Sequence, residues 1–121
     1  MQQLRFKETM SFDDRRAWFL SLVSKHENKI PVVVETDPRS TIKFFSFKLT
    51  LKPTVQISML AKIVRDKIQL SNSEAIFLFC GNVSLAGNKV LGETYEKYRD
   101  KDGFLYIVVS NICLPFYTSF I

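Results

Sequence analysis

Residues capable of covalent chemistry are few in this sequence, and they do not form a catalytic pattern. The one histidine is His26, and the two cysteines are Cys80 and Cys113. A nucleophilic cysteine needs a neighbouring base or cation that favours its thiolate, and Cys113 has no histidine or aspartate in such a context. Cys80 follows an apolar run, where a buried free thiol is the usual outcome. Cysteines this far apart also provide no metal-ligand pattern and no disulfide framework. We therefore predict a binding protein that is not an enzyme and has no cofactor.

The charge balance favours acidic partners. The 121 residues include 17 Lys and Arg against 12 Asp and Glu, a formal net charge of +5. This charge suits an acidic peptide, an anionic membrane surface or nucleic acid, or it serves only solubility. The basic residues are scattered singly rather than gathered into a stripe, which argues against nucleic acid. A small basic protein that binds a membrane surface or nucleic acid, through an apolar tail or scattered Lys and Arg, is the alternative to peptide binding.

Hydrophobic spacing predicts the elements that must position any binding residues. Ser11 is a candidate N-cap for a helix that runs to about Lys25, with a short extra helix before it within residues 4–9. Phe45, Phe47, Leu49 and Leu51 alternate with period two, so they share one face of a strand. The final strand is apolar on both faces and is expected to be central. The predicted order is helices up to 25, strands 30–35 and 45–52, helix 57–68, strand 75–80, helix 91–98 and strand 104–109.

No linker or repeat divides the chain, and its length fits one domain. The first residues lack the apolar region of a signal peptide, and no run approaches a membrane span, which predicts a cytoplasmic protein. We expect N-terminal helices over residues 1–26, a mixed sheet with helices over 27–110, and an apolar tail over 111–121 that packs against the domain or a membrane surface.

Several segments resemble one family, in the same order and at nearly the same spacing. The chain is similar to the autophagy ubiquitin-like modifiers of the GABA-receptor-associated-protein and microtubule light-chain-three type, from about Phe6 to Ser110. The resemblance implies an α+β fold, a ubiquitin-like β-grasp roll with an additional N-terminal helical segment, as a single domain over residues 1–121. The segments that carry it are Phe6-Lys7-Glu8, Phe12-Asp13-Asp14-Arg15-Arg16, Ile30-Pro31-Val32-Val33-Val34-Glu35, Ile68-Gln69-Leu70, Ala75-Ile76-Phe77-Leu78-Phe79, Asn82-Val83, Gly92-Glu93-Thr94-Tyr95 and Asp102-Gly103-Phe104-Leu105-Tyr106-Ile107.

The resemblance implies binding of cargo receptors and adaptors that carry an aromatic-x-x-aliphatic motif with acidic flanks. The peptide would add to the strand edge formed by Lys48, Leu49, Thr50, Leu51 and Lys52. By the resemblance, an aromatic pocket is lined by Leu22, Pro31, Val33, Leu49, Leu51 and Phe104. An aliphatic pocket uses Val55, Leu60, Ile63 and the stem of Lys67, with Pro53 at its rim. Lys25, Lys29, Lys48 and Lys67 would attract the acidic flanks.

The sequence departs from the family pattern at the groove and at the end. Trp18 stands where the family has an acidic or polar residue, so we expect it to fill part of the aromatic pocket. The family is joined through a C-terminal Gly to phosphatidylethanolamine on autophagic membranes. Phe116 occupies the place of that Gly, and no Gly follows Gly103. We therefore expect no lipid conjugation of this chain as written, while recruitment to autophagosomal or vesicle membranes and contacts with conjugation or processing proteins stay open.

Overall fold

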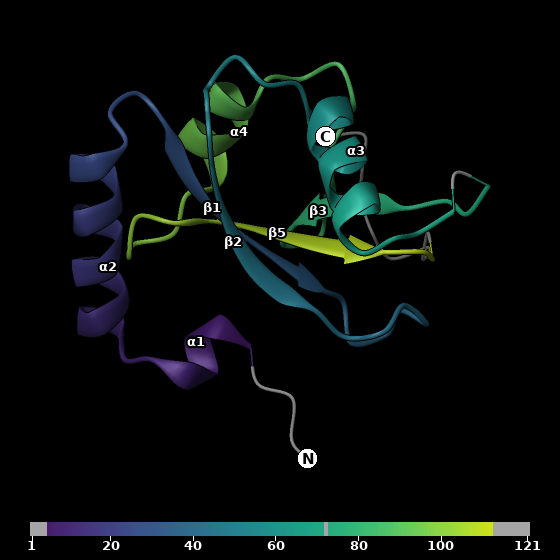
Figure 1. Cartoon of the computed structure of the whole chain (residues 1–121), viewed down its shortest axis with the longest axis horizontal. Coiled ribbons are helices and arrows are strands. Elements are labelled where there is room, and N and C mark those ends of the chain that lie inside the picture. Colours follow the sequence, from purple (N-terminus) through teal and green to yellow (C-terminus); the bar gives the residue numbers. More distant parts are fainter. Residues whose placement is uncertain (1–4, 72, 113–121) are drawn as a thin grey trace.

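The computed structural model describes residues 5–71 and 73–112. Five strands form one mixed sheet in the order β2-β1-β5-β3-β4. Helices lie on both sides of this sheet, α1 and α2 on one side and α3 and α4 on the other (Figure 1). The elements are α1 (Phe6–Thr9), α2 (Phe12–Lys25), β1 (Ile30–Thr36), β2 (Ser46–Leu51), α3 (Ile57–Lys67), β3 (Phe77–Cys80), β4 (Val83–Ser84), α4 (Leu91–Tyr98) and β5 (Leu105–Ser110).

The central strands follow from their sequences. β1 and β5 run parallel to each other, and β1 also pairs antiparallel with β2. Every residue of β1 is buried, because helices cover both faces of the sheet at this point. Pro31 has no amide hydrogen to donate, and it lies at the start of β1, before the pairing with β5 begins at Val32. The prediction that the last strand is central is confirmed.

Strand alternation divides the core into two clusters. Val32 and Val34 of β1 point toward α3 and α4, where they join Leu60 of α3 and Leu91 of α4. Val33 points to the opposite side and joins a second cluster, whose members are Phe6, Met10, Phe19, Leu22, Phe104 and Tyr106. The expected α+β roll with an N-terminal helical segment is therefore the observed architecture.

Polar contacts fix the two N-terminal helices to the sheet. The Ser11 hydroxyl accepts a hydrogen bond from the Asp14 amide at 3.1 Å, which confirms Ser11 as the N-cap of α2. Arg15 lies on the inner side of α2 and donates from Nε to the buried Asp102 carboxylate at 2.9 Å. Asp102 also accepts from the Phe104 amide at 2.9 Å. This buried pair holds α2 against the turn that leads into β5.

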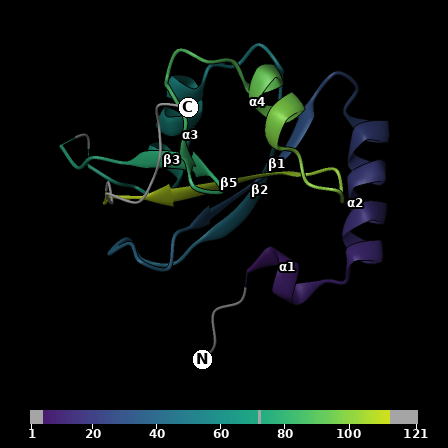
Figure 2. The same cartoon turned by 180° about the vertical axis from the view of Figure 1, so that it is seen from behind.

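Gly103 is required where that turn passes under α2. Its φ of +103° lies in the region that side chains rarely adopt, and an added Cβ would come within 2.3 Å of the Phe19 ring. The Gly103 carbonyl also accepts from the Tyr95 hydroxyl at 2.8 Å. The turn therefore brings the C-terminal end of α4, the start of β5 and the side of α2 together, as the reverse view shows (Figure 2).

Candidate binding groove at the edge strand

Strand β2 forms one edge of the sheet. In the described part of the chain it pairs with β1 alone, over the register from Ile30–Leu51 to Glu35–Ser46. An edge strand exposes a row of main-chain donors and acceptors that another strand can use. All six residues of β2 are half-buried, so helices border the strand without covering it.

The pairing pattern identifies which main-chain groups of β2 face outward. The Thr36 amide donates to the Phe45 carbonyl at 3.1 Å, one pair beyond the end of the β1–β2 ladder. Hydrogen-bonded and non-hydrogen-bonded pairs alternate along an antiparallel ladder. By this alternation Phe47, Leu49 and Leu51 bond to β1, whereas the amides and carbonyls of Ser46, Lys48 and Thr50 point away from the sheet.

On the α2 side of β2, three side chains form a compact group that we call the Phe6–Trp18–Lys48 cluster. The Phe6 and Trp18 rings meet edge to face with centroids 5.6 Å apart. The Lys48 ammonium lies 4.4 Å from the Phe6 ring centroid and 4.9 Å from that of Trp18. Burial lowers the pKa of Lys48, although the nearby Glu35 carboxylate opposes this. The cluster combines an apolar surface with a positive charge beside the free strand edge.

The residues behind this cluster are inaccessible in this conformation. Val33 and Phe104 are fully buried, and Pro31 is buried as well. Leu22 is half-buried on the same side of the sheet. Phe6 packs on Phe104 in the same cluster as Val33, and Trp18 and Lys48 lie on Phe6. Displacement of Trp18 and Lys48 would therefore expose Phe6 to an aromatic side chain from a partner, and Val33 and Phe104 would become accessible only if Phe6 moved as well.

On the α3 side of β2, the structure has an open hollow and a second cation. The Lys67 ammonium lies 5.3 Å from the Phe47 ring centroid, so the stem of Lys67 borders the strand. A hollow of about 440 Å³ continues from there along the loop before β2. Ile63 is half-buried, whereas Leu60 is fully buried in the core. The hollow is lined mainly by Ile42, Phe44, Phe45, Phe47, Lys67 and Ile68.

The two leucines of β2 lie on the opposite face from the pocket predicted for them. The resemblance groups Leu49 and Leu51 with Leu22, yet both leucines pack against the core cluster on the α3 and α4 side. The reason is the period-two alternation, which places them on the same face as Phe47. Lys48 and Thr50 face α2 instead. Leu60 likewise belongs to the core and not to an exposed aliphatic pocket.

The remaining predicted residues surround the ends of the groove. Lys25 and Lys29 are exposed at the end of α2 and before β1. Lys52 and Pro53 are exposed directly after β2. Val55 is half-buried, and its carbonyl accepts from the Leu91 amide at 2.7 Å, which ties this loop to α4. These positions border the strand edge, and peptide binding there stays a prediction.

Sequence reasoning did not identify Phe6 as part of the groove. Phe6 is the only aromatic residue before Phe12, and its amide donates to the Glu35 carboxylate at 2.7 Å. The Ser46 hydroxyl donates to the same carboxylate at 2.8 Å. Glu35 therefore attaches the start of α1 to both β1 and β2. The one sequence signal for this role was that Phe6 is the single aromatic residue in the short helix predicted within residues 4–9.

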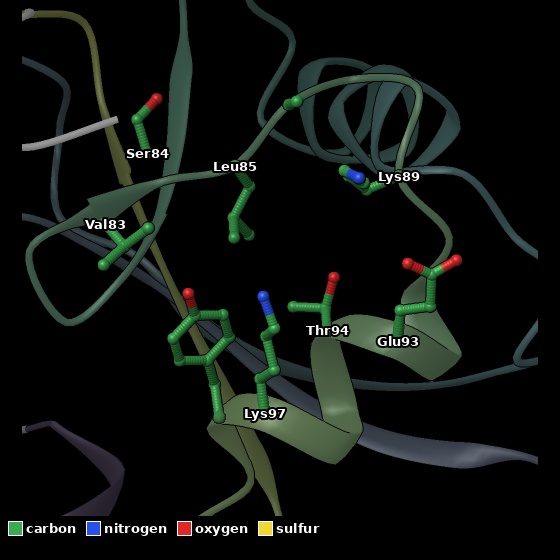
Figure 3. A pocket seen from close by; sticks show the side chains of 9 residues that line it. Val83, Ser84, Leu85, Lys89, Glu93, Thr94 and Lys97 are labelled. Carbon is green, nitrogen blue, oxygen red and sulfur yellow. The ribbon is translucent and has the colours of Figure 1, made fainter. Parts of the chain in front are cut away.

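A separate hollow of about 140 Å³ lies at the opposite edge of the sheet, between β4 and α4. Figure 3 shows the Lys97 side chain extending from α4 into this space, toward Leu85. Val83 and Thr94 form other parts of its wall. None of these residues was predicted to bind a partner, and the strand order places the hollow away from β2.

Two predictions concern features other than the groove. Phe116, the residue at the family's Gly position, and the tail beyond Ile112 lie outside the described residues. Over residues 5–71 and 73–112, no helix has both the length and the apolar character needed to cross a bilayer.

Comparisons with known proteins agree with this fold. Residues 14–113 match the family model described as "Autophagy protein Atg8 ubiquitin like". The chain is 33% identical to autophagy-related protein 8e of Arabidopsis thaliana over 106 residues, which cover 87% of each protein. It is 32% identical to autophagy-related protein 8 of Mycosarcoma maydis over 106 residues, 87% of this chain and 90% of the relative. The crystal structure of Trypanosoma brucei ATG8 superposes with a TM-score of 0.84 at 23% identity, covering 90% of this chain and 95% of that one.

Proposed function

Because this chain belongs to the Atg8 family of ubiquitin-like autophagy proteins, we propose that it binds short peptide motifs of other autophagy proteins along the edge of β2. The motif has an aromatic and an aliphatic residue three positions apart, with acidic residues beside them. The partners are cargo receptors and adaptors that carry such a segment. The peptide adds to the sheet as a further strand.

Over residues 5–71 and 73–112 the outer edge of β2 has no partner strand, and this observation carries the proposal. Lys48 and Thr50 direct main-chain donors and acceptors outward, and a strand added there would satisfy them without disturbing the β1 ladder. Their spacing of two residues matches the repeat of an extended peptide.

Different chemistry on the two sides of β2 supports the proposed specificity. Within the Phe6–Trp18–Lys48 cluster, Phe6 offers ring surface to an aromatic side chain that displaces Trp18, and Lys48 offers a cation to an acidic neighbour. Phe47, Ile63 and the stem of Lys67 offer apolar surface to an aliphatic side chain on the α3 side. Lys25 and Lys29 extend the positive region beyond the end of α2.

A proline substitution on the edge tests the binding mode directly. Thr50→Pro removes the outward amide hydrogen, while the bonds from β2 to β1 come from Phe47, Leu49 and Leu51. Calorimetry with an acidic Trp-x-x-Leu peptide should show saturable binding to the wild type and a loss of about tenfold or more in Thr50→Pro, since a main-chain donor would be lost inside the complex.

Thr50→Val is the matched control, because it keeps the amide hydrogen and a β-branched side chain. The account requires this variant to bind within about threefold of the wild type. Amide spectra of all three proteins establish that the fold is retained. Equal binding by a folded Thr50→Pro variant would exclude strand addition at this edge.

A further inference from the structure

The two faces of β3 pack against different parts of the molecule. Leu78 and Cys80 point toward α3 and α4, where they belong to the core cluster on that side. Because strand side chains alternate, Phe77 and Phe79 point to the opposite side of the sheet. Val108 of β5 pairs with Phe79 and therefore points to this side as well. We call this surface the Phe77–Phe79–Val108 face.

The helices α1 and α2 lie on the same side of the sheet but farther along it. Their cluster contains Phe6, Val33 and Phe104 and extends across the sheet to Tyr106. Both views place α2 at one end of the molecule and β3 toward the other (Figure 1, Figure 2). Among the described residues, Phe79 belongs to neither core cluster. The two N-terminal helices therefore cover β1 and the start of β5 rather than β3.

Phe79 is nevertheless fully buried. Its exposed fraction is 0%, whereas Phe77 and Val108 beside it are half-buried. A phenylalanine on an uncovered sheet face would expose much of its ring, because a sheet face is buried only where another layer packs on it. The burial of Phe79 therefore requires a covering segment on this face.

The end of β5 directs the chain toward this face. Ser110 pairs with Phe77, so the two side chains point to the same side of the sheet. The Ser110 hydroxyl accepts from the Ile112 amide at 3.0 Å and donates to the Ile112 carbonyl at 3.1 Å. These local bonds form a turn that bends the main chain toward the Ser110 side chain. The chain therefore leaves β5 beside the Phe77–Phe79–Val108 face.

The sequence after Ile112 has the length and the composition of a suitable cover. An extended chain advances about 3.3 Å per residue, so residues 113–121 can span about 30 Å. The path from Ser110 back to Tyr106 along β5 takes only about 13 Å by the same measure. Residues 113–121 contain no Asp, Glu, Lys or Arg, and their large apolar or aromatic members are Leu114, Phe116, Tyr117, Phe120 and Ile121.

Residues 1–4 are a weaker candidate for the cover. Met1 and Leu4 are their only apolar members, and the other two are glutamines. They lead into α1, whose first residue donates from its amide to Glu35 of β1 at 2.7 Å. The N-terminal segment therefore begins near β1, whereas the C-terminal segment begins beside β3.

We propose that residues 113–121 turn back over the Phe77–Phe79–Val108 face and pack their apolar side chains on it. The segment is an intramolecular cap, and its high effective concentration keeps a second molecule from the same face. Phe116, at the position of the family's conjugated Gly, is held against the sheet and is not presented to other proteins. The cap is independent of peptide binding at β2, because β1 and β5 lie between β2 and β3.

Paramagnetic broadening in the full chain tests this placement. A nitroxide is attached to Ser119→Cys in a Cys113→Ser background, and the remaining thiol, Cys80, is buried at 4% exposure. Amide signals of the Phe77–Phe79–Val108 face should lose most of their intensity relative to the same sample with the label reduced. Signals of β2 and α2 should keep their intensity.

Two substitutions in the labelled chain separate packing from mere proximity. Phe116→Ser removes one aromatic ring from the cap, so it should restore most of the lost intensity. The apolar dye ANS should then bind about threefold more strongly, because the sheet face becomes exposed. Thr118→Ala is the matched control and should leave both the broadening and the dye signal unchanged. Amide spectra establish that each variant is folded.

Four results would overturn the proposal. Two of them are broadening that is weak and evenly spread over the chain, and equal behaviour of the Phe116→Ser and Thr118→Ala variants. The third is broadening that arises only between copies in a mixture of nitroxide-labelled and isotope-labelled chains, which would assign the cover to a second copy. The fourth is loss of the broadening when phosphatidylcholine vesicles are added, which would assign residues 113–121 to a membrane surface.

Discussion

Trp18 is the residue whose position most affects the proposed aromatic pocket. Its ring and the Lys48 ammonium both lie against Phe6, which in turn packs on Phe104 in the buried cluster that contains Val33. An aromatic side chain from a peptide would therefore compete with Trp18 for the same apolar surface. The expectation that Trp18 fills part of the aromatic pocket stays a prediction, and the contact between Trp18 and Phe6 is the observation on which we base the next experiment.

Trp18→Ala should strengthen binding of a Trp-x-x-Leu peptide by about fivefold, because the peptide no longer displaces an aromatic contact of about 1 kcal/mol. Calorimetry on the wild type and the variant measures this. Leu20→Ala, on the other side of α2, is the control and should leave the affinity unchanged. Weaker binding by Trp18→Ala would mean that the indole is itself a contact surface for the peptide.

Cys80 illustrates how burial suppresses chemistry at a single residue. Burial raises the pKa of its thiol to about 12, and the side chain donates weakly to the Tyr106 carbonyl at 3.5 Å. A thiol pKa that is higher in the folded state than in the unfolded state stabilises the fold below the unfolded pKa of about 8.5. That contribution is lost as the pH rises from about 8.5 toward the folded value.

We predict that Cys80 resists thiol reagents at pH near 8 until the protein unfolds. The measurement is the labelling rate in a Cys113→Ser background, which leaves Cys80 as the only thiol. Labelling should be slow in buffer and fast in denaturant. Rapid and complete labelling of the native protein would show that β3 is accessible to solvent.

At the scale of elements, periodicity identified the strands and helices but not what covers each face. The alternation from Phe45 to Leu51 correctly placed these side chains on one face of β2. Nothing in that pattern says whether α2 or α3 covers the face, because topology decides this. Assigning residues one by one from the family resemblance therefore placed Leu49 and Leu51 on the α2 side of the sheet. Strand geometry instead requires both side chains to lie on the same face as Phe47.

Other differences also have physical causes. The two residues of β4 are too few for any periodicity to be detected. Phe6 joins the groove through long-range contacts with Glu35 and Trp18 that local sequence does not encode. By contrast, the Ser11 cap and the Asp37–Ser40 turn were predictable, because each depends on local hydrogen bonds.

The two α3 residues Leu60 and Ile63 should respond differently to truncation. Leu60→Ala should lower the free energy of unfolding by about 3 kcal/mol, because Leu60 is fully buried, and should leave peptide affinity unchanged in the folded fraction. Ile63→Ala should cost about 1 kcal/mol and weaken peptide binding, because Ile63 is half-buried and lies one helical turn before Lys67, which contacts Phe47 of β2. Denaturant unfolding and calorimetry separate the two effects. The reverse pattern would place the aliphatic contact elsewhere.

At the scale of the whole molecule, the net charge of +5 is distributed so that cations lie on both sides of α2. Lys48 borders the groove, whereas Arg16 and Arg99 line the hollow between α2 and the turn after α4.

Salt should weaken the peptide complex through its association rate. Raising NaCl from about 50 mM to about 500 mM shortens the screening length and should slow association of an acid-flanked peptide by about tenfold, with a smaller change in dissociation. Stopped-flow kinetics measures both rates. A peptide with neutral flanks should show little salt dependence, and an equal response from both peptides would rule out electrostatic attraction by the groove.

The most direct test of the central claim is an NMR titration of the chain with an acidic Trp-x-x-Leu peptide. We predict saturable amide shifts that cluster on Ser46, Lys48 and Thr50 and extend to Trp18 and Ile63. Such shifts would follow the edge of β2 and both of its borders. Absent shifts, diffuse shifts, or shifts centred on the hollow between β4 and α4 would contradict peptide addition at this edge.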